Sequence, residues 1–245
     1  MLEIDAKGAY YRDLNRQVRE AVARGEKEIR LKNVNGQYYI GDGLRGASVI
    51  TIEGVPGNDL AAFMDGPTLR VKGNAQDNIA NTMNSGKVII EGNAGDVLGY
   101  GMRGGKLHIR GSVGYRVGIH MKGMKKQAPT IIVGGCAGDF FGEYMAGGVL
   151  ILLGLDDRDG APLVGDYLGT GMHGGVIYVR GEVDKDICGA EVGVMDPDDE
   201  DRKVLMESLT EYCKDFGLEL EEVMKKGFKK LVPVSSRPYG NLYAY

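Results

Sequence analysis

The feature that most constrains the fold is a glycine that follows a short aliphatic segment and recurs at a regular interval. The seven glycines are Gly54, Gly73, Gly92, Gly111, Gly135, Gly154 and Gly181. The first four are 19 residues apart, and later intervals are longer. Hairpins would need a turn every roughly 8–12 residues, and a propeller blade needs about 40 residues. A period of 19 residues fits one coil of a β-solenoid.

The segments before these glycines alternate between aliphatic and other residues. Positions four and two residues before the glycine are always aliphatic: Ile50 and Ile52, Leu69 and Val71, Val88 and Ile90, Leu107 and Ile109, Ile131 and Val133, Leu150 and Leu152, and Ile177 and Val179. Strict alternation indicates strands with one buried face. Parallel crossovers are right-handed. The sequence therefore predicts an all-β fold, a right-handed parallel β-helix of about seven turns with helical N- and C-terminal flanks.

Two further patterns follow the same period. Methionines recur as Met64, Met83, Met102 and Met121, and their matching positions predict side chains stacked in the core. The residue before the glycine alternates in charge, as Glu53, Lys72, Glu91 and Arg110. Unlike charges attract across adjacent strands, so this order is expected to help specify register. The longer intervals coincide with polar insertions at Lys122–Pro129 and Leu155–Pro162, which we interpret as loops.

The chain divides into three predicted parts. Residues 1–35 form an N-terminal cap, with a helix over Tyr11–Arg24 and a strand over Glu28–Val34. Residues 36–194 contain the glycine-rich repeats. Residues 195–245 contain an acidic linker, a helix over Val204–Phe216, a short helix over Glu219–Lys226 and an extended tail. The tail is too apolar to remain in solvent, so we expect it to lie along the β-helix or against a partner.

Outward positions change character on the fifth and sixth repeats. Ile132, Ile151 and Leu153 occupy places that are polar or charged in the earlier repeats. If the strands stack as predicted, these three residues form an apolar patch, and such patches are normally covered. Two coverings are open: the chain's own terminal helix, or a partner protein. The patch is therefore a candidate partner-docking site.

An acidic column is a candidate for cation binding. Six residues before the repeat methionines stand Asn58, Asp77, Asp96, Asp139 and Asp166, with Tyr115 in the fourth place. Glycine-rich β-rolls that bind calcium place carboxylates on successive coils. Here each coil offers one carboxylate, so we favour the alternative that each side chain bonds its own turn as an Asx-turn.

Other candidate chemistry is weaker. Three segments match G-x-G-x-x-G, beginning at Gly41, Gly99 and Gly169, but a strand rather than a helix follows each, which disfavours a dinucleotide site. His108, His120 and His173 share no metal-ligand spacing, and His108 lies at an outward strand position. Cys136, Cys188 and Cys213 form no CxxC pair, so we expect free thiols. The sequence predicts no catalytic, cofactor-binding or metal site within this chain.

Composition and charge argue against several classes of function. The formal net charge is −4, and no clustered Lys/Arg face is evident, which argues against nucleic-acid binding. No apolar run approaches the ~20 residues of a membrane-spanning helix, and no signal-peptide pattern opens the chain. We therefore expect a cytoplasmic protein that binds neither nucleic acid nor membrane.

The repeat G-D-x-x-G-x-x-M-x-G-G-x-x-x-x-x-G resembles a known domain. Three copies carry the likeness: GDVLGYGMRGGKLHIRG (Gly95–Gly111), GDFFGEYMAGGVLILLG (Gly138–Gly154) and GDYLGTGMHGGVIYVRG (Gly165–Gly181). They resemble the GXGXG-motif domain, the C-terminal β-helix of the glutamate synthase large subunit. The domain also occurs in one of the subunits of formylmethanofuran dehydrogenase. The tail FKKLVPVSSRPY is similar to the end of glutamate-synthase-type chains.

This resemblance implies a split enzyme. In glutamate synthase an amidotransferase domain hydrolyses glutamine with an N-terminal cysteine. A second domain, holding FMN and an iron–sulfur cluster, converts 2-oxoglutarate to glutamate. This chain begins Met1-Leu2, lacks the cluster cysteines and has no flavin barrel, so it resembles only the third, structural part.

The resemblance therefore predicts a non-catalytic subunit that positions amidotransferase and FMN/iron–sulfur synthase subunits. Two alternatives stay open. One is the corresponding GXGXG-type subunit of a formylmethanofuran dehydrogenase complex, and the other is a metal-binding solenoid.

Overall fold

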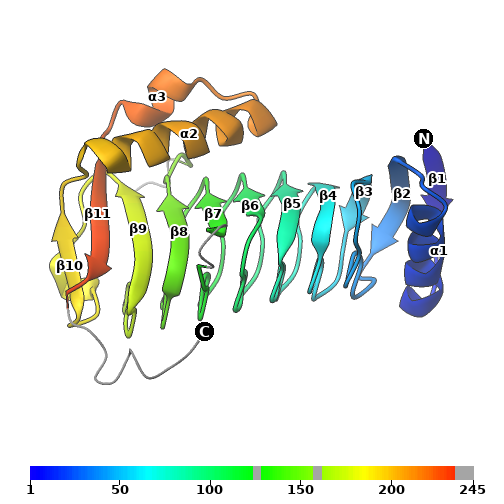
Figure 1. Cartoon of the computed structure of the whole chain (residues 1–245), viewed down its shortest axis with the longest axis horizontal. Helices are drawn as coiled ribbons and strands as arrows, with labels where there is room; N and C mark the ends of the chain where they lie inside the picture. Colours follow the sequence, from blue (N-terminus) through cyan, green and yellow to red (C-terminus); the bar gives the residue numbers. More distant parts are fainter. Residues whose placement is uncertain (124–127, 157–161, 235–245) are drawn as a thin grey trace.

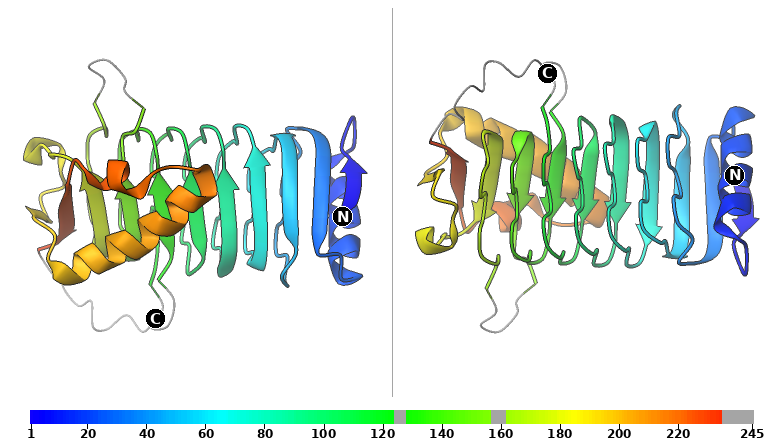
Figure 2. Two further views of the ribbon diagram at one scale, coloured as in Figure 1. Left: turned by 90° about the horizontal axis from the view of Figure 1, so that it is seen from above. Right: turned by 90° about the horizontal axis from the view of Figure 1, so that it is seen from below.

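The computed structural model describes residues 1–123, 128–156 and 162–234. The chain forms an elongated column of stacked strands (Figure 1). Helix α1 (Tyr11–Ala23) lies at one end, and helices α2 (Asp199–Phe216) and α3 (Leu220–Met224) lie across one face near the other end (Figure 2). The strands are β1 (Leu2–Asp5), β2 (Glu28–Asn35), β3 (Val49–Val55), β4 (Asp65–Lys72), β5 (Ser85–Ile90), β6 (Lys106–Ile109), β7 (Thr130–Val133), β8 (Ala146–Leu152), β9 (Gly174–Arg180), β10 (Val192–Met195) and β11 (Phe228–Pro233).

The strands form one sheet that follows chain order from β1 to β9. Every pair in this run is parallel, so the predicted parallel β-helix is confirmed. The seven predicted repeat strands are β3 to β9, and six coils join them, so the repeat region has about six turns rather than seven. Residues 124–127 and 157–161 of the two predicted insertion loops lie outside the described residues.

The predicted inward positions stack in register. One row of partners reads Ile50, Leu69, Val88, Leu107, Ile131, Leu150 and Ile177. All are fully buried. Full burial of such a side chain is worth roughly 1.5–3 kcal/mol relative to exposure, so rows of this kind supply much of the column's stability.

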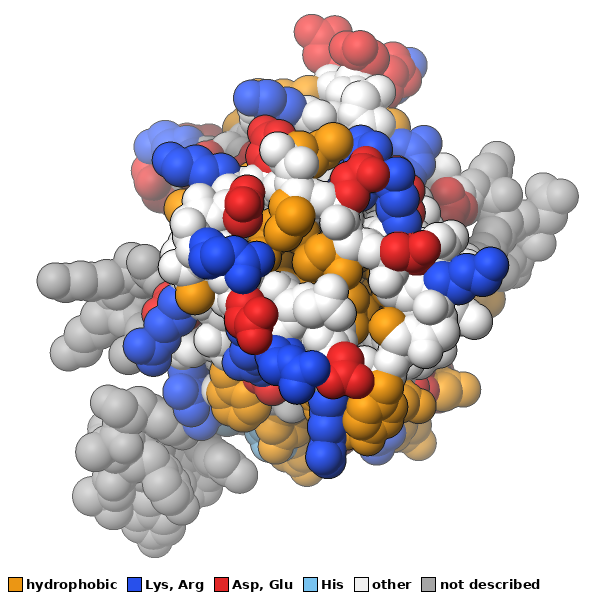
Figure 3. All heavy atoms as spheres, turned by 90° about the vertical axis from the view of Figure 1, so that its right-hand side faces the viewer, with side chains coloured by type: hydrophobic (Ala, Val, Ile, Leu, Met, Phe, Trp, Pro, Cys, Tyr) orange, Lys and Arg blue, Asp and Glu red, His pale blue; other side chains and the backbone are white. Residues whose placement is uncertain are grey.

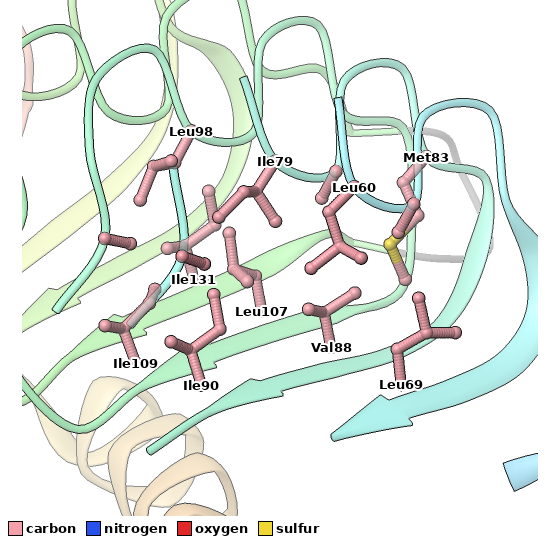
Figure 4. Packing of buried hydrophobic residues seen from close by; sticks show 14 of the residues in the cluster. Leu60, Leu69, Ile79, Met83, Val88, Ile90, Leu98, Leu107, Ile109 and Ile131 are labelled. Atoms are coloured by element: carbon pink, nitrogen blue, oxygen red, sulfur yellow. The ribbon is translucent and has the colours of Figure 1, made fainter. Parts of the chain in front are cut away.

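The core lies between the strands and the turn segments that precede the repeat methionines. Leu60, Ile79 and Leu98 project from these turn segments toward Val88 and Leu107 of the strands (Figure 4). The repeat methionines, including Met83, are buried in the same core, as predicted. The turn segments therefore form the wall of the core opposite the sheet.

The turn segments use left-handed backbone at regular positions. The residue five before each methionine has a φ between 55° and 63°: Asp59, Asn78, Val97, Arg116, Phe140 and Tyr167. This conformation costs roughly 1–2 kcal/mol per non-glycine residue. Hydrogen bonds between coils offset the cost. The Asn78 amide donates to the Asp96 carbonyl on the next coil at 2.9 Å, and the Gly99 amide donates to the Ile79 carbonyl on the previous one at 2.7 Å.

Helix α1 and strand β1 lie at the N-terminal end of the column (Figure 1). Helix α1 buries Leu14, Val18 and Ala21. Strand β1 was not predicted, and it extends the ladder by pairing in parallel with β2. Seen from this end, hydrophobic side chains occupy the centre and charged side chains of both signs surround them (Figure 3).

The first helix of the C-terminal part begins earlier than predicted. Helix α2 begins at Asp199, not at Val204, so most of the predicted acidic linker is helical. The cause is a capping box: Asp198 accepts the Asp201 amide, and the Asp201 carboxylate accepts the Asp198 amide, each at 2.9 Å. The α2 helix ends at Phe216, and its C-cap residue Gly217 has a left-handed φ of 64°.

The tail enters the sheet rather than lying along the column. Strand β11 inserts between β9 and β10 and is antiparallel to both. Residues 235–245, which include the SSRPY sequence, lie outside the described residues. In the part of the chain that the structure describes, no helix is long and apolar enough to span a bilayer.

Candidate docking surfaces

The structure places the candidate patch beneath α2. Ile132, Ile151 and Leu153 have 0%, 0% and 1% of their surface exposed. They share a second apolar cluster with Leu205 and Leu209 of α2, and also with Tyr178, Tyr212, Cys213, Val223 and Phe228. Of the two coverings that the sequence allowed, the chain's own terminal helix is the one observed. The three residues are therefore not a free surface of the folded chain, and their assignment as an exposed docking patch is corrected.

The C-terminal half of α2 contacts strands β4 to β6 through charged and polar side chains, which we call the polar border. Asp215 lies at its centre and contacts His108 and Lys87, with 2.7 Å between the Asp215 carboxylate and His108 Nδ1. Glu211, one turn earlier, accepts from Lys87 at 2.7 Å and also pairs with Lys106. His108 is 1% exposed. The outward placement of His108 was predicted, but its burial and its partners were not, because the α2 partners lie over 100 residues away.

Burial and hydrogen bonding set the protonation of this border. Burial lowers the pKa of His108 and outweighs the opposite effect of the Asp215 carboxylate. Burial alone would raise the pKa of Asp215, but hydrogen bonds from His108 and Lys87 hold that pKa below its usual value. The pKa of Glu211 is set in the same way: burial alone would raise it, but hydrogen bonds from Lys106 and Lys87 hold it below its usual value. The border is therefore built from neutral His108 and two ionised carboxylates.

The acidic column proves to be a chain of hydrogen bonds between coils. Asp77 Oδ1 accepts the Asp96 amide at 2.9 Å, and Asp96 Oδ1 accepts the Tyr115 amide at 2.9 Å. Asp139 does the same for the Asp166 amide at 3.0 Å. The side chains thus bond the next coil, and the expectation of an Asx-turn within the same coil is wrong. These hydrogen bonds explain why the acidic residues recur at regular spacing.

The same hydrogen bonds explain the glycine of each G-D pair. A Cβ added to Gly95 would lie 1.9 Å from Asp77 Oδ1, and a Cβ on Gly165 would lie 2.0 Å from Asp139 Oδ1. Neither glycine has a left-handed φ, so the requirement is space alone. A second column of side chains makes the same kind of hydrogen bond between coils. Asn74 Oδ1 accepts the Asn93 amide, and Asn93 Oδ1 accepts the Ser112 amide.

The remaining candidates are dispersed. His120 stacks on Tyr144 with 5.5 Å between ring centroids, and His173 Nδ1 lies 3.3 Å from the Gly171 carbonyl. Cys136, Cys188 and Cys213 are free thiols. Among the described residues, no group of three or more His, Cys, Asp or Glu side chains is arranged to hold a metal ion.

Sequence reasoning missed one surface, which consists of exposed aromatic side chains on the turn segments. Tyr100, Tyr115, Tyr144 and Tyr167 are 41–55% exposed. They lie on the turn segments that precede the repeat methionines. A count of aromatic residues per coil would have found them.

Comparisons with known proteins agree with this architecture. The family model described as GXGXG motif matches residues 12–235. An uncharacterised protein of Methanocaldococcus jannaschii is 44% identical over 248 residues, covering 98% of this chain and 95% of that protein. A chain of the formyltransferase/hydrolase complex of Methylorubrum extorquens, solved with methylofuran, has a similar fold: the TM-score is 0.64 at 23% identity, over 84% of this chain and 72% of that one. The chain is a member of the GXGXG-motif family.

Proposed function

We propose that this chain is a non-catalytic structural subunit of a multi-subunit complex of the glutamate synthase type. In this proposal it positions a glutamine amidotransferase subunit relative to a synthase subunit that carries FMN and an iron–sulfur cluster. The observation that carries the proposal is the family match, which spans residues 12–235 and therefore includes nearly all of the column and its caps. The chain itself would supply no cofactor.

The architecture suits such a role. A parallel solenoid whose coils are locked by side-chain-to-backbone hydrogen bonds is stiff along its length, because each coil is fixed to its neighbours. Solenoids of this kind offer long surfaces for binding other proteins. The outward side chains of the turn segments remain exposed along the column.

A second candidate has its own support. The similar fold in the formyltransferase/hydrolase complex of Methylorubrum extorquens favours membership of a formylmethanofuran dehydrogenase-type or related complex. Both candidates predict a structural subunit, and they differ in the partners.

Purification of the tagged chain from its native host tests both candidates. We expect stoichiometric recovery of an amidotransferase subunit and a flavin- and iron–sulfur-containing subunit, identified by mass spectrometry and by the flavin absorbance spectrum. Recovery of formyltransferase or hydrolase subunits instead would establish the second candidate and overturn the first. A chain recovered without partner subunits would overturn both.

A further inference from the structure

We draw no further inference here: the strongest candidate, the surface patch of exposed aromatic side chains on the turn segments (Tyr100, Tyr115, Tyr144 and Tyr167), carries none because nothing in the structure shows what covers it.

Discussion

Among single residues, the G-D pairs show how the repeat is enforced. The Asp carboxylate of one coil reaches the backbone amide of the next, and the glycine before that amide leaves room for it. An unbonded buried amide would cost free energy, and a Cβ at the glycine would collide with the carboxylate oxygen. Sequence and structure are thus linked by pairs of residues about one repeat apart rather than by neighbours in the chain.

This link can be measured with a double-mutant cycle. Gly95→Ala places a methyl group in the path of Asp77 Oδ1, and we expect it to lower stability by about 1–3 kcal/mol, as overpacking does. Asp77→Ala removes the obstacle, so Gly95→Ala should cost less in that background. Thermal unfolding of the four proteins gives the coupling. Additive effects would contradict the steric explanation.

A second prediction about single residues concerns the core. Val179 is 1% exposed and belongs to the stacked inward residues of β9. Val179→Asp would bury a carboxylate among aliphatic side chains, so we expect loss of the cooperative thermal transition or a fall in midpoint of more than about 10 °C. Val179→Ile keeps the residue apolar and serves as the control. A near-wild-type melt for the Asp variant would place this side chain outside the core.

Among the secondary-structure elements, the strands could be predicted from the sequence and the terminal helices only in part. Alternation and period predict the ladder and its register, because both are visible in the sequence of one coil and of the coil that follows it. The start of α2 was misplaced, since the run MDPDDEDRK resembles a polar linker until its capping box is recognised. The covering of the patch could not be assigned, because Ile132 and Ile151 indicate only that something covers them. The insertion of β11 between β9 and β10 left no local signal at all.

The packing of α2 leads to a prediction about this element. Ile151→Asp places a carboxylate under the helix, and we expect α2 to loosen while the coils stay folded. Hydrogen exchange should then show lost protection at Leu205 and Leu209 but retained protection in β4 and β5. Lys203→Ala, on the exposed side of α2, is the matched control. Loss of protection along the whole column would show that Ile151 is part of the solenoid core itself.

The polar border predicts how α2 responds to acid. The lowered pKa values of Asp215 and Glu211 mean that these groups stabilise the folded state above their unfolded pKa and lose that effect as pH falls through their folded values. His108 acts in the same direction, since its pKa is lowered from 6.5 on folding and the unfolded state is protonated first. We expect the thermal midpoint to fall as the pH decreases below about 6.5.

The His108→Gln variant isolates one part of that response. Glutamine can still donate to Asp215 but does not titrate, so the fall between pH 7 and pH 5 should be smaller than in the wild-type chain. A wild-type midpoint that rises on acidification over this range would contradict the assignment of neutral His108 and ionised Asp215.

As a whole, the molecule is a stiff column with one sheet face covered by its own helix and one turn face left exposed. The family match places the chain among the GXGXG-motif proteins, and in the proposed function it is a subunit that binds other proteins. In a split glutamate synthase such a column would connect two catalytic subunits without taking part in either reaction.

Reconstitution from separately purified subunits, with and without this chain, tests whether the column connects two catalytic parts. We predict that omitting the chain lowers glutamine-dependent glutamate formation by about 10-fold or more, because the two catalytic parts are no longer held together. Ammonia-dependent glutamate formation by the flavin-containing subunit should be unchanged. Equal glutamine-dependent rates with and without the chain would contradict the proposed structural role.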